Sequence, residues 1–166
     1  MPVRRFRCHA LLRRLGGCPR GSTAVEFGLT APLLVLLAFG AYDYGSAYVE
    51  SVRLNGAARA GAQQALYNAQ DWQNTDQMEQ VALEEYAGQA LTPEELAAMP
   101  VAASAEAFCA CTGGVALACT DTCPGGAAPG QFVSVQLSNA TPLTLPYPWA
   151  DGDTVQVDGQ AVVRVR

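Results

Sequence analysis

The longest apolar run of the chain lies near its N-terminus. Residues 22–42 read STAVEFGLTAPLLVLLAFGAY and carry one charge, that of Glu26. A helix of this length spans about 31 Å at ~1.5 Å per residue, close to the ~30 Å hydrocarbon core of a bilayer. The pattern therefore predicts a membrane-spanning helix over 22–42, with Glu26 near one edge of the hydrocarbon.

The helix is predicted to continue outside the membrane over residues 43–70. This stretch is rich in alanine and contains no proline, which favours a helix. Small residues recur in it at four-residue spacing and form a stripe that another backbone can approach closely. The stripe consists of Ala57, Ala58, Gly61, Ala62 and Ala65. The pattern leaves two packing partners open, the protein's own sheet and a neighbouring subunit.

Two shorter helices are predicted after residue 70. Residues 71–75 (DWQNT) interrupt the first helix, and 76–89 carry apolar residues at helical spacing. The sequence Thr92-Pro93-Glu94-Glu95 is typical of a capping box with proline at the first helical position. It predicts a short helix that ends before Pro100.

From residue 102 the apolar period changes to two, which is typical of strands. Strands are predicted over 102–111, 131–139 and 154–166, joined as an antiparallel meander. In the last strand the side chains expected to face inward are Val155, Val157, Ala161, Val163 and Val165, with Val162 as an exception. The segment 141–149 contains too many prolines for a central strand, so a surface loop is predicted there.

These elements predict an α+β fold. A long N-terminal helix, membrane-spanning in its first half, is expected to pack on a small antiparallel three-stranded sheet, with one or two short extra helices. Residues 1–21 form a basic leader in this scheme. Residues 71–166 form an extracytoplasmic α+β domain with a cysteine-rich loop.

Charge fixes the expected orientation. Residues 1–20 hold six Arg and no acid, whereas 22–166 hold four Arg and all fifteen Asp and Glu, a net charge of −11. A basic flank before a membrane helix stays in the cytoplasm, so the acidic body is expected outside. A body this acidic is a poor ligand for nucleic acid, because phosphate binding needs a basic face.

The composition offers few combinations of residues that could support catalysis. The chain has a single histidine, His9, and it lies in the basic N-terminal segment. We therefore expect neither Ser-His-Asp nor Cys-His catalysis, and no metal site built from several histidines. Asp151-Gly152-Asp153 is typical of a turn before the last strand rather than of a metal site. We therefore expect no enzyme, no metal site and no cofactor.

The six cysteines divide at the apolar run. Cys8 and Cys18 precede it, and four others follow it in a compartment where disulfides persist. These four are Cys109, Cys111, Cys119 and Cys123. They allow three pairings, of which a hairpin through 112–118 favours the nested one, with Cys111–Cys119 inside Cys109–Cys123. The alternative is a zinc site of all four, although their C-x-C and C-x3-C spacings depart from the common C-x2-C.

The N-terminal quarter of the chain resembles a known family. The resemblance is carried by Gly21-Ser22-Thr23-Ala24-Val25-Glu26-Phe27, by the apolar run from Pro32, and by Tyr42-Asp43-Tyr44-Gly45 and residues 54–62. This pattern looks like the TadE-like family. Its members are minor pilins or pseudopilins of the tight-adherence (Tad, or Flp) branch of type IV pilus machines.

The resemblance implies a processing site. A prepilin peptidase is expected to cleave after Gly21, so that Ser22 becomes the first mature residue. Glu26 is then mature position five, where pilins keep an acid, and the aromatic Phe27 follows it. A carboxylate there can pair with its own or a neighbour's N-terminal amine, because unpaired charge is costly in lipid. The other role open to this acid is to interact with the helix dipole alone.

The resemblance also implies partners and a location. The expected partners are the prepilin peptidase, other pilins and pseudopilins, the Tad inner-membrane platform and membrane lipid, with no nucleic acid. The expected location is the bacterial inner membrane, single-pass, with a periplasmic C-terminal domain, or the pilus itself. The implied function is assembly of a Flp-type pilus, with roles in adherence and biofilm formation. The alternative is an unprocessed single-pass scaffold of the Tad secretion machine.

Overall fold

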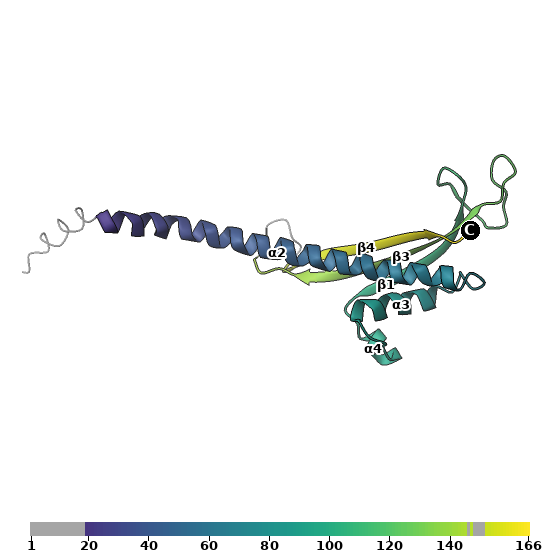
Figure 1. Cartoon of the computed structure of the whole chain (residues 1–166), viewed down its shortest axis with the longest axis horizontal. Helices are drawn as coiled ribbons and strands as arrows, with labels where there is room; N and C mark the ends of the chain where they lie inside the picture. The colour runs from purple at the N-terminus through teal and green to yellow at the C-terminus, as the bar shows by residue number, and fades with distance from the viewer. Residues whose placement is uncertain (1–18, 146, 148–151) are drawn as a thin grey trace, which may run out of the picture. The chain divides into compact units, whose positions relative to one another are not determined.

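The computed structural model describes residues 19–145, 147 and 152–166. The chain divides into two compact units, Met1–Tyr42 and Asp43–Arg166. Helix α2 (Pro19–Tyr67) contributes to both units (Figure 1). The predicted leader lies almost wholly outside the described residues, which begin at Pro19.

The first unit is represented by the apolar part of α2. This helix is long and apolar enough to cross a membrane, and its most apolar stretch is not buried inside the protein. Pro32 lies within it. The hydroxyl of Thr30 donates to the backbone oxygen of Glu26 at 3.0 Å, so this polar side chain is satisfied by its own helix.

The second unit is a two-layer α+β domain. Its sheet has the order β2-β1-β3-β4, and every neighbouring pair is antiparallel. The strands are β1 (Ala102–Ala110), β2 (Ala116–Leu117), β3 (Gly130–Pro142) and β4 (Thr154–Arg164). Two shorter helices follow α2 in this unit, α3 (Thr75–Ala87) and α4 (Pro93–Ala97).

The sheet has four strands, so the prediction of three is wrong by one. The additional strand is β2, whose two residues pair with Cys109 and Ala110 of β1. A strand this short shows no alternation in the sequence, which is why the period of two did not reveal it. The three predicted strands, β1, β3 and β4, do lie next to one another in chain order.

The prediction of a loop over 141–149 is wrong at its first two residues. β3 continues through Thr141 and Pro142, which pair with β4. The register between β1 and β3 ends at Ser138, so beyond this point β3 pairs with β4 alone. A proline is tolerated where a strand has a neighbour on one side only. Residues 146 and 148–151 of the segment lie outside the described residues.

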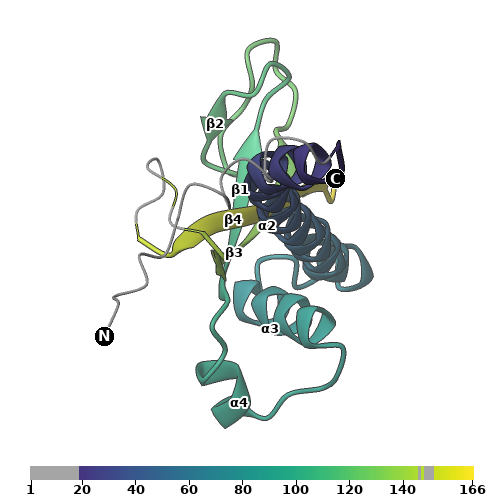
Figure 2. The same cartoon turned by 90° about the vertical axis from the view of Figure 1, so that its left-hand side faces the viewer.

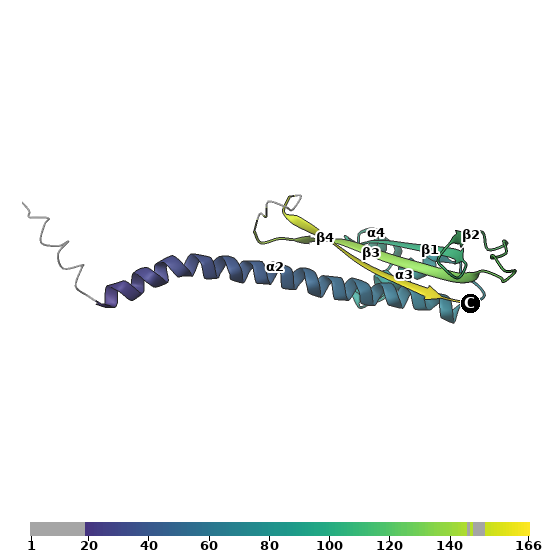
Figure 3. The same cartoon turned by 90° about the horizontal axis from the view of Figure 1, so that it is seen from above.

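One face of the sheet carries the core. The odd-numbered residues of β3 and β4 point toward the helices, and the inward residues predicted for β4 are buried or half-buried while Val162 is exposed, as predicted. Figure 3 shows α2 running along this sheet, and Figure 2 shows α3 beside α2. The side chains at the centre of the core, all less than 2 % exposed, include Leu54, Met78, Val133, Val135 and Leu137.

Two glycines let the layers approach closely. A Cβ built on Gly61 of α2 would lie 2.7 Å from the backbone oxygen of Met78 and 2.8 Å from the Cβ of Ala82, both in α3. A Cβ on Gly159 of β4 would lie 2.5 Å from backbone atoms of Leu54 and Asn55 in α2. Larger residues at either position would therefore separate the elements that bury the core.

The short helices begin and end at recognisable caps. In α3, Asn74 accepts a hydrogen bond from the Gln77 N–H at 3.2 Å, and Gly88 ends the helix at φ 73°. In α4, Thr92 and Glu95 form the predicted capping box. The hydrogen bonds from the backbone N–H and the hydroxyl of Thr92 lower the pKa of the Glu95 carboxyl.

Candidate functional site

The predicted processing site lies in the first turn of α2. This helix begins at Pro19, so Gly21 and Ser22 both have helical backbone. Glu26 and Phe27 follow one turn later on the surface of the helix, and the Phe27 ring is 68 % exposed. Both side chains are therefore accessible to another helix or to lipid.

The apolar side chains after Phe27 are also exposed. They project from α2 and have no cover from the described part of their own unit. Those more than half exposed in this stretch are Leu29, Leu33, Leu34, Val35, Leu36, Leu37 and Tyr42. A helix surface of this kind is stable in lipid or against other apolar helices, and costly in water.

The small-residue stripe packs within the chain. Ala57, Ala58, Ala62 and Ala65 are at most 1 % exposed, and Gly61 contacts α3 and Val135 of β3. The sequence left open whether the stripe packs on the protein's own sheet or on a neighbouring subunit. In the structure it packs on the sheet of its own chain and on α3. The stripe is not a free surface for a neighbouring subunit.

Sequence reasoning missed the role of Asp43. This residue follows the apolar run directly and is 4 % exposed. Its Oδ1 accepts the Thr144 N–H at 3.0 Å, and its Oδ2 accepts the Tyr147 hydroxyl at 2.9 Å. The signal was present in the sequence, because Asp43, Glu50, Leu54 and Gly61 recur at helical spacing on the buried face of α2.

These hydrogen bonds set the charge state of Asp43. The Thr144 hydroxyl, and then the backbone N–H of Thr144 and the Tyr147 hydroxyl, hold the pKa of the Asp43 carboxyl below its ordinary value, although burial opposes them. Burial and the nearby carboxylate raise the pKa of the Tyr147 hydroxyl. Asp43 is thus a carboxylate at neutral pH, and it attaches the connection between β3 and β4 to α2.

Replacing Asp43 by asparagine is expected to loosen this connection. A carboxyl whose pKa is lowered on folding stabilises the native state above its unfolded-state pKa and loses this effect as pH falls through its folded-state pKa. The difference in stability between wild type and Asp43→Asn should therefore be full at pH 7 and shrink below about pH 4. Thermal unfolding across this pH range checks the expectation. A difference that is equal at pH 7 and pH 3 would contradict it.

A second polar cluster joins three elements of the domain. The Tyr86 hydroxyl of α3 and the Asn139 amide of β3 both donate to Glu50 Oε1 of α2, each at 2.6 Å. The Arg53 guanidinium lies 4.3 Å from the centre of the Tyr86 ring and donates to the Tyr86 backbone oxygen at 2.7 Å. Burial, and then the contact with Glu50, raise the pKa of the Tyr86 hydroxyl. These contacts give Glu50 a structural role.

The cysteines are paired differently from the nested prediction, which is wrong. Cys109 bonds to Cys119 and Cys111 to Cys123, with Cα atoms 5.1 and 5.7 Å apart. The turn after Cys111 is tighter than a hairpin through 112–118, since the Cys111 N–H donates to the Val115 oxygen at 3.1 Å. This register places Leu117 opposite Cys109, so Cys119 comes within reach of Cys109 instead of Cys111.

The tight turn depends on two glycines. Gly113 and Gly114 have φ angles of 109° and 82°, which only glycine adopts readily. The resulting bridges leave none of the four sulfurs as a thiolate. The zinc alternative requires a different state of this loop, because zinc binds cysteine as a thiolate.

Thiol counting on double variants tests the pairing. Cys109→Ala/Cys119→Ala should leave Cys111–Cys123 intact and leave no free thiol among these four positions. Cys111→Ala/Cys119→Ala should leave two free thiols among them and cost more stability, since each bridge typically contributes about 2–4 kcal/mol. With the nested pairing, the first double variant would instead leave two free thiols among these positions, and the second would leave none.

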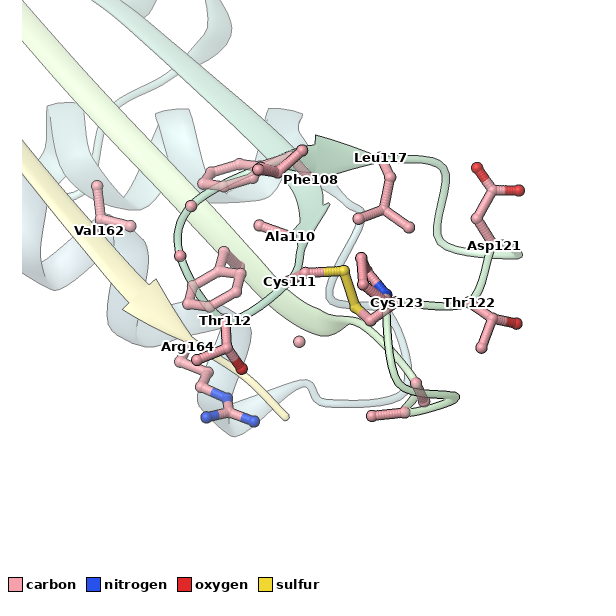
Figure 4. Close-up of a pocket in the computed structure, with 18 residues that line it drawn as sticks. Phe108, Ala110, Cys111, Thr112, Leu117, Asp121, Thr122, Cys123, Val162 and Arg164 are labelled. Carbon is pink, nitrogen blue, oxygen red and sulfur yellow. A yellow bond between two sulfur atoms is a disulfide. The ribbon is translucent and has the colours of Figure 1, made fainter.

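The loop closed by the two disulfides borders an open apolar pocket, on the face of the sheet that points away from the helices. The pocket measures about 980 Å³, and Figure 4 shows the Cys111–Cys123 bridge within it, with Phe108, Val162 and Arg164 around it. Phe108 stacks on Phe132 with ring centres 5.6 Å apart. The arrangement offers apolar surface rather than a set of groups suited to catalysis.

Comparison with known proteins gives one match, and it covers the N-terminal site. No curated protein and no solved structure matches the chain. Residues 21–63 match the family model described as TadE-like protein. The matched stretch begins at Gly21, includes Glu26 and Asp43, and ends beyond the first residues of the buried stripe. The resemblance predicted from the sequence is therefore confirmed, and residues 21–63 are a TadE-like segment.

Proposed function

We propose that the protein is a minor pilin or pseudopilin that acts in the assembly of a Flp-type (Tad) pilus. The observation that supports this most is the family match over residues 21–63, which begins at the proposed cleavage site. The helix that follows exposes its apolar side chains, as a helix that packs among other pilin helices requires. Roles in adherence and biofilm formation follow from the resemblance.

In this proposal a prepilin peptidase removes the leader after Gly21. Ser22 then carries a new α-amine at the start of α2, and the carboxylate of Glu26 lies about one turn away. The apolar part of α2 lies in the inner membrane, with the domain from Asp43 onward on the periplasmic side. Platform proteins and other pilins contact the exposed surface of α2.

One observation favours the rival, a permanent single-pass scaffold that is never processed. Helix α2 begins at Pro19, so the bond between Gly21 and Ser22 lies in a helical turn. A peptidase that binds an extended backbone must first unwind this turn. The rival and the proposal therefore differ in one measurable property, the N-terminus of the protein extracted from membranes.

The chain offers a direct test, because it contains no lysine. An amine-reactive reagent therefore labels the α-amine alone. Extracted wild-type protein should carry its label on Ser22 and lack the mass of residues 1–21. Gly21→Leu should retain that mass, since a bulky side chain obstructs the extended backbone that cleavage requires.

Gly28→Leu is the matched control, because Gly28 lies on the same helix with open space around it. It should be processed like wild type. Label on the original N-terminus of the wild-type protein would support the scaffold. A Gly21→Leu protein of mature mass would show that cleavage occurs elsewhere.

A further inference from the structure

Two tyrosines lie on α2 directly after its most apolar part. Tyr44 and Tyr48 are one turn apart, and their side chains are 77 % and 63 % exposed. Asp43 beside them is 4 % exposed and faces the domain. The two phenol rings therefore project away from the domain while the neighbouring carboxylate is hidden in it.

The fold brings a third tyrosine to the same level. Tyr147 belongs to the connection between β3 and β4, 104 residues from Asp43 in the sequence, and donates its hydroxyl to that carboxylate at 2.9 Å. The Thr144 N–H binds the other carboxylate oxygen at 3.0 Å. Tyr44 and Tyr48 thus lie one turn apart on one face of α2, and Tyr147 lies beside the same part of the helix, at Asp43; we refer to the three as the tyrosine collar.

We propose that the tyrosine collar lies in the lipid headgroup layer on the outer side of the membrane. This inference rests on the proposed function, because it requires residues 22–42 to span the bilayer. A tyrosine has an apolar ring and a polar hydroxyl, and tyrosines are enriched where membrane proteins cross the headgroup region. The collar would hold the domain at the membrane surface by these contacts.

The spacing along the helix fits the thickness of that layer. At ~1.5 Å per residue, Tyr44 and Tyr48 lie about 3 and 9 Å beyond the last residue of the predicted span. The headgroup layer is about 5–8 Å thick on each side of the hydrocarbon. Tyr44 therefore falls within the layer, and Tyr48 lies at its outer boundary.

The charge distribution fits as well. Between Phe27 and Val49 the only charged residue in the sequence is Asp43. Its carboxylate is buried and accepts hydrogen bonds from Thr144 and Tyr147, so it is withdrawn from the surface that would face lipid. The structure thus removes the one charge that would oppose contact between this part of α2 and the bilayer.

Depth-dependent fluorescence quenching tests the proposal on the full-length chain. Single substitutions Leu36→Trp, Tyr44→Trp, Tyr48→Trp and Tyr67→Trp are made in a Trp149→Phe background, where the buried Trp72 gives a constant signal. The proteins are reconstituted in vesicles of phosphatidylcholine and phosphatidylglycerol. The phosphatidylcholine carries a nitroxide either on its headgroup or deep in an acyl chain.

The tryptophans at 44 and 48 should be quenched at least about twofold more by the headgroup nitroxide than by the deep one. Tyr67→Trp is the matched control, since Tyr67 is 81 % exposed on the same helix but about 29 Å beyond Tyr48 along it. Neither probe should quench it. Equal quenching at 44 and 67 would overturn the proposal.

Leu36→Trp separates failure of the collar from failure of the membrane anchor. It should be quenched by the deep nitroxide if α2 spans the bilayer. Loss of that quenching would contradict the anchor and the proposed function with it. Normal quenching at 36, combined with either no quenching or mainly deep quenching at 44 and 48, would overturn the collar alone.

Discussion

Replacing Gly159 by alanine is expected to destabilise the domain that begins at Asp43 by about 3 kcal/mol, the upper end of the usual cost of overpacking. The new Cβ would lie 2.5 Å from the backbone nitrogen of Asn55 and the carbonyl carbon of Leu54. Both are backbone atoms of α2, so no side-chain rotation relieves the contact. The helix must move away from β4, and Leu54, which is fully buried, then loses its packing.

Chemical unfolding of the full chain in detergent measures this effect through the fluorescence of its tryptophans. Gly56→Ala is the control, because Gly56 is exposed on α2 and has open space where its Cβ would be. Helix propensity predicts that this change stabilises the protein by up to about 1 kcal/mol. Equal unfolding midpoints for Gly159→Ala and wild type would contradict the close approach of α2 to β4.

The main strands were predictable because one face of the sheet is buried. Burial of one face imposes a period of two, and β4 follows it from Val155 to Val163 with a single exposed valine at 162. The capping box at Thr92 was predictable for a similar reason, since its signal lies within four consecutive residues. Both features follow from a physical requirement on residues close together in the sequence, so they can be predicted without knowledge of the fold.

The disulfide pairing could not be obtained in this way. It depends on how tightly the chain turns after Cys111, and the two glycines at 113 and 114 allow a tighter turn than a symmetric hairpin. The position of Pro142 in a strand has a comparable cause. Its acceptability depends on where β1 stops pairing with β3, which is a property of the assembled sheet.

Asp43 shows why a charge beside an apolar run is difficult to interpret from sequence. Its position suggests the end of a membrane span, where a solvated acid is common. The structure instead buries it against partners that lie about a hundred residues later. Helical spacing from the alanine stripe places Asp43 on the buried face, but the sequence did not identify Thr144 and Tyr147 as its donors.

Replacing Glu26 by alanine is expected to abolish assembly while leaving the protein inserted and folded. Removing a charge makes an apolar segment easier to insert, so membrane extraction should be unchanged. The domain that begins at Asp43 is a separate compact unit, so its bridges should still form. In the proposed mature pilin, the change removes the partner of the Ser22 amine, or of the first residue of a neighbouring pilin.

The expected size of this loss follows from the cost of an unpaired charge. Removing one partner of a fully buried ion pair typically costs about 3–5 kcal/mol. Water at the membrane edge reduces this cost, so we expect capture of pilin partners to fall by at least about tenfold. Co-purification of the mature protein with its partners measures the loss, together with pilus and biofilm formation.

Glu26→Asp is the matched variant, because it keeps the carboxylate and shortens the side chain by one methylene. It should recover much of the partner capture that Glu26→Ala loses, since the amine again has an anion within reach. Thiol counting and membrane extraction of both variants show whether the domain and the anchor remain intact. Normal pili and normal partner capture with Glu26→Ala would mean that this acid interacts only with the helix dipole, and the pairing with the Ser22 amine would be wrong.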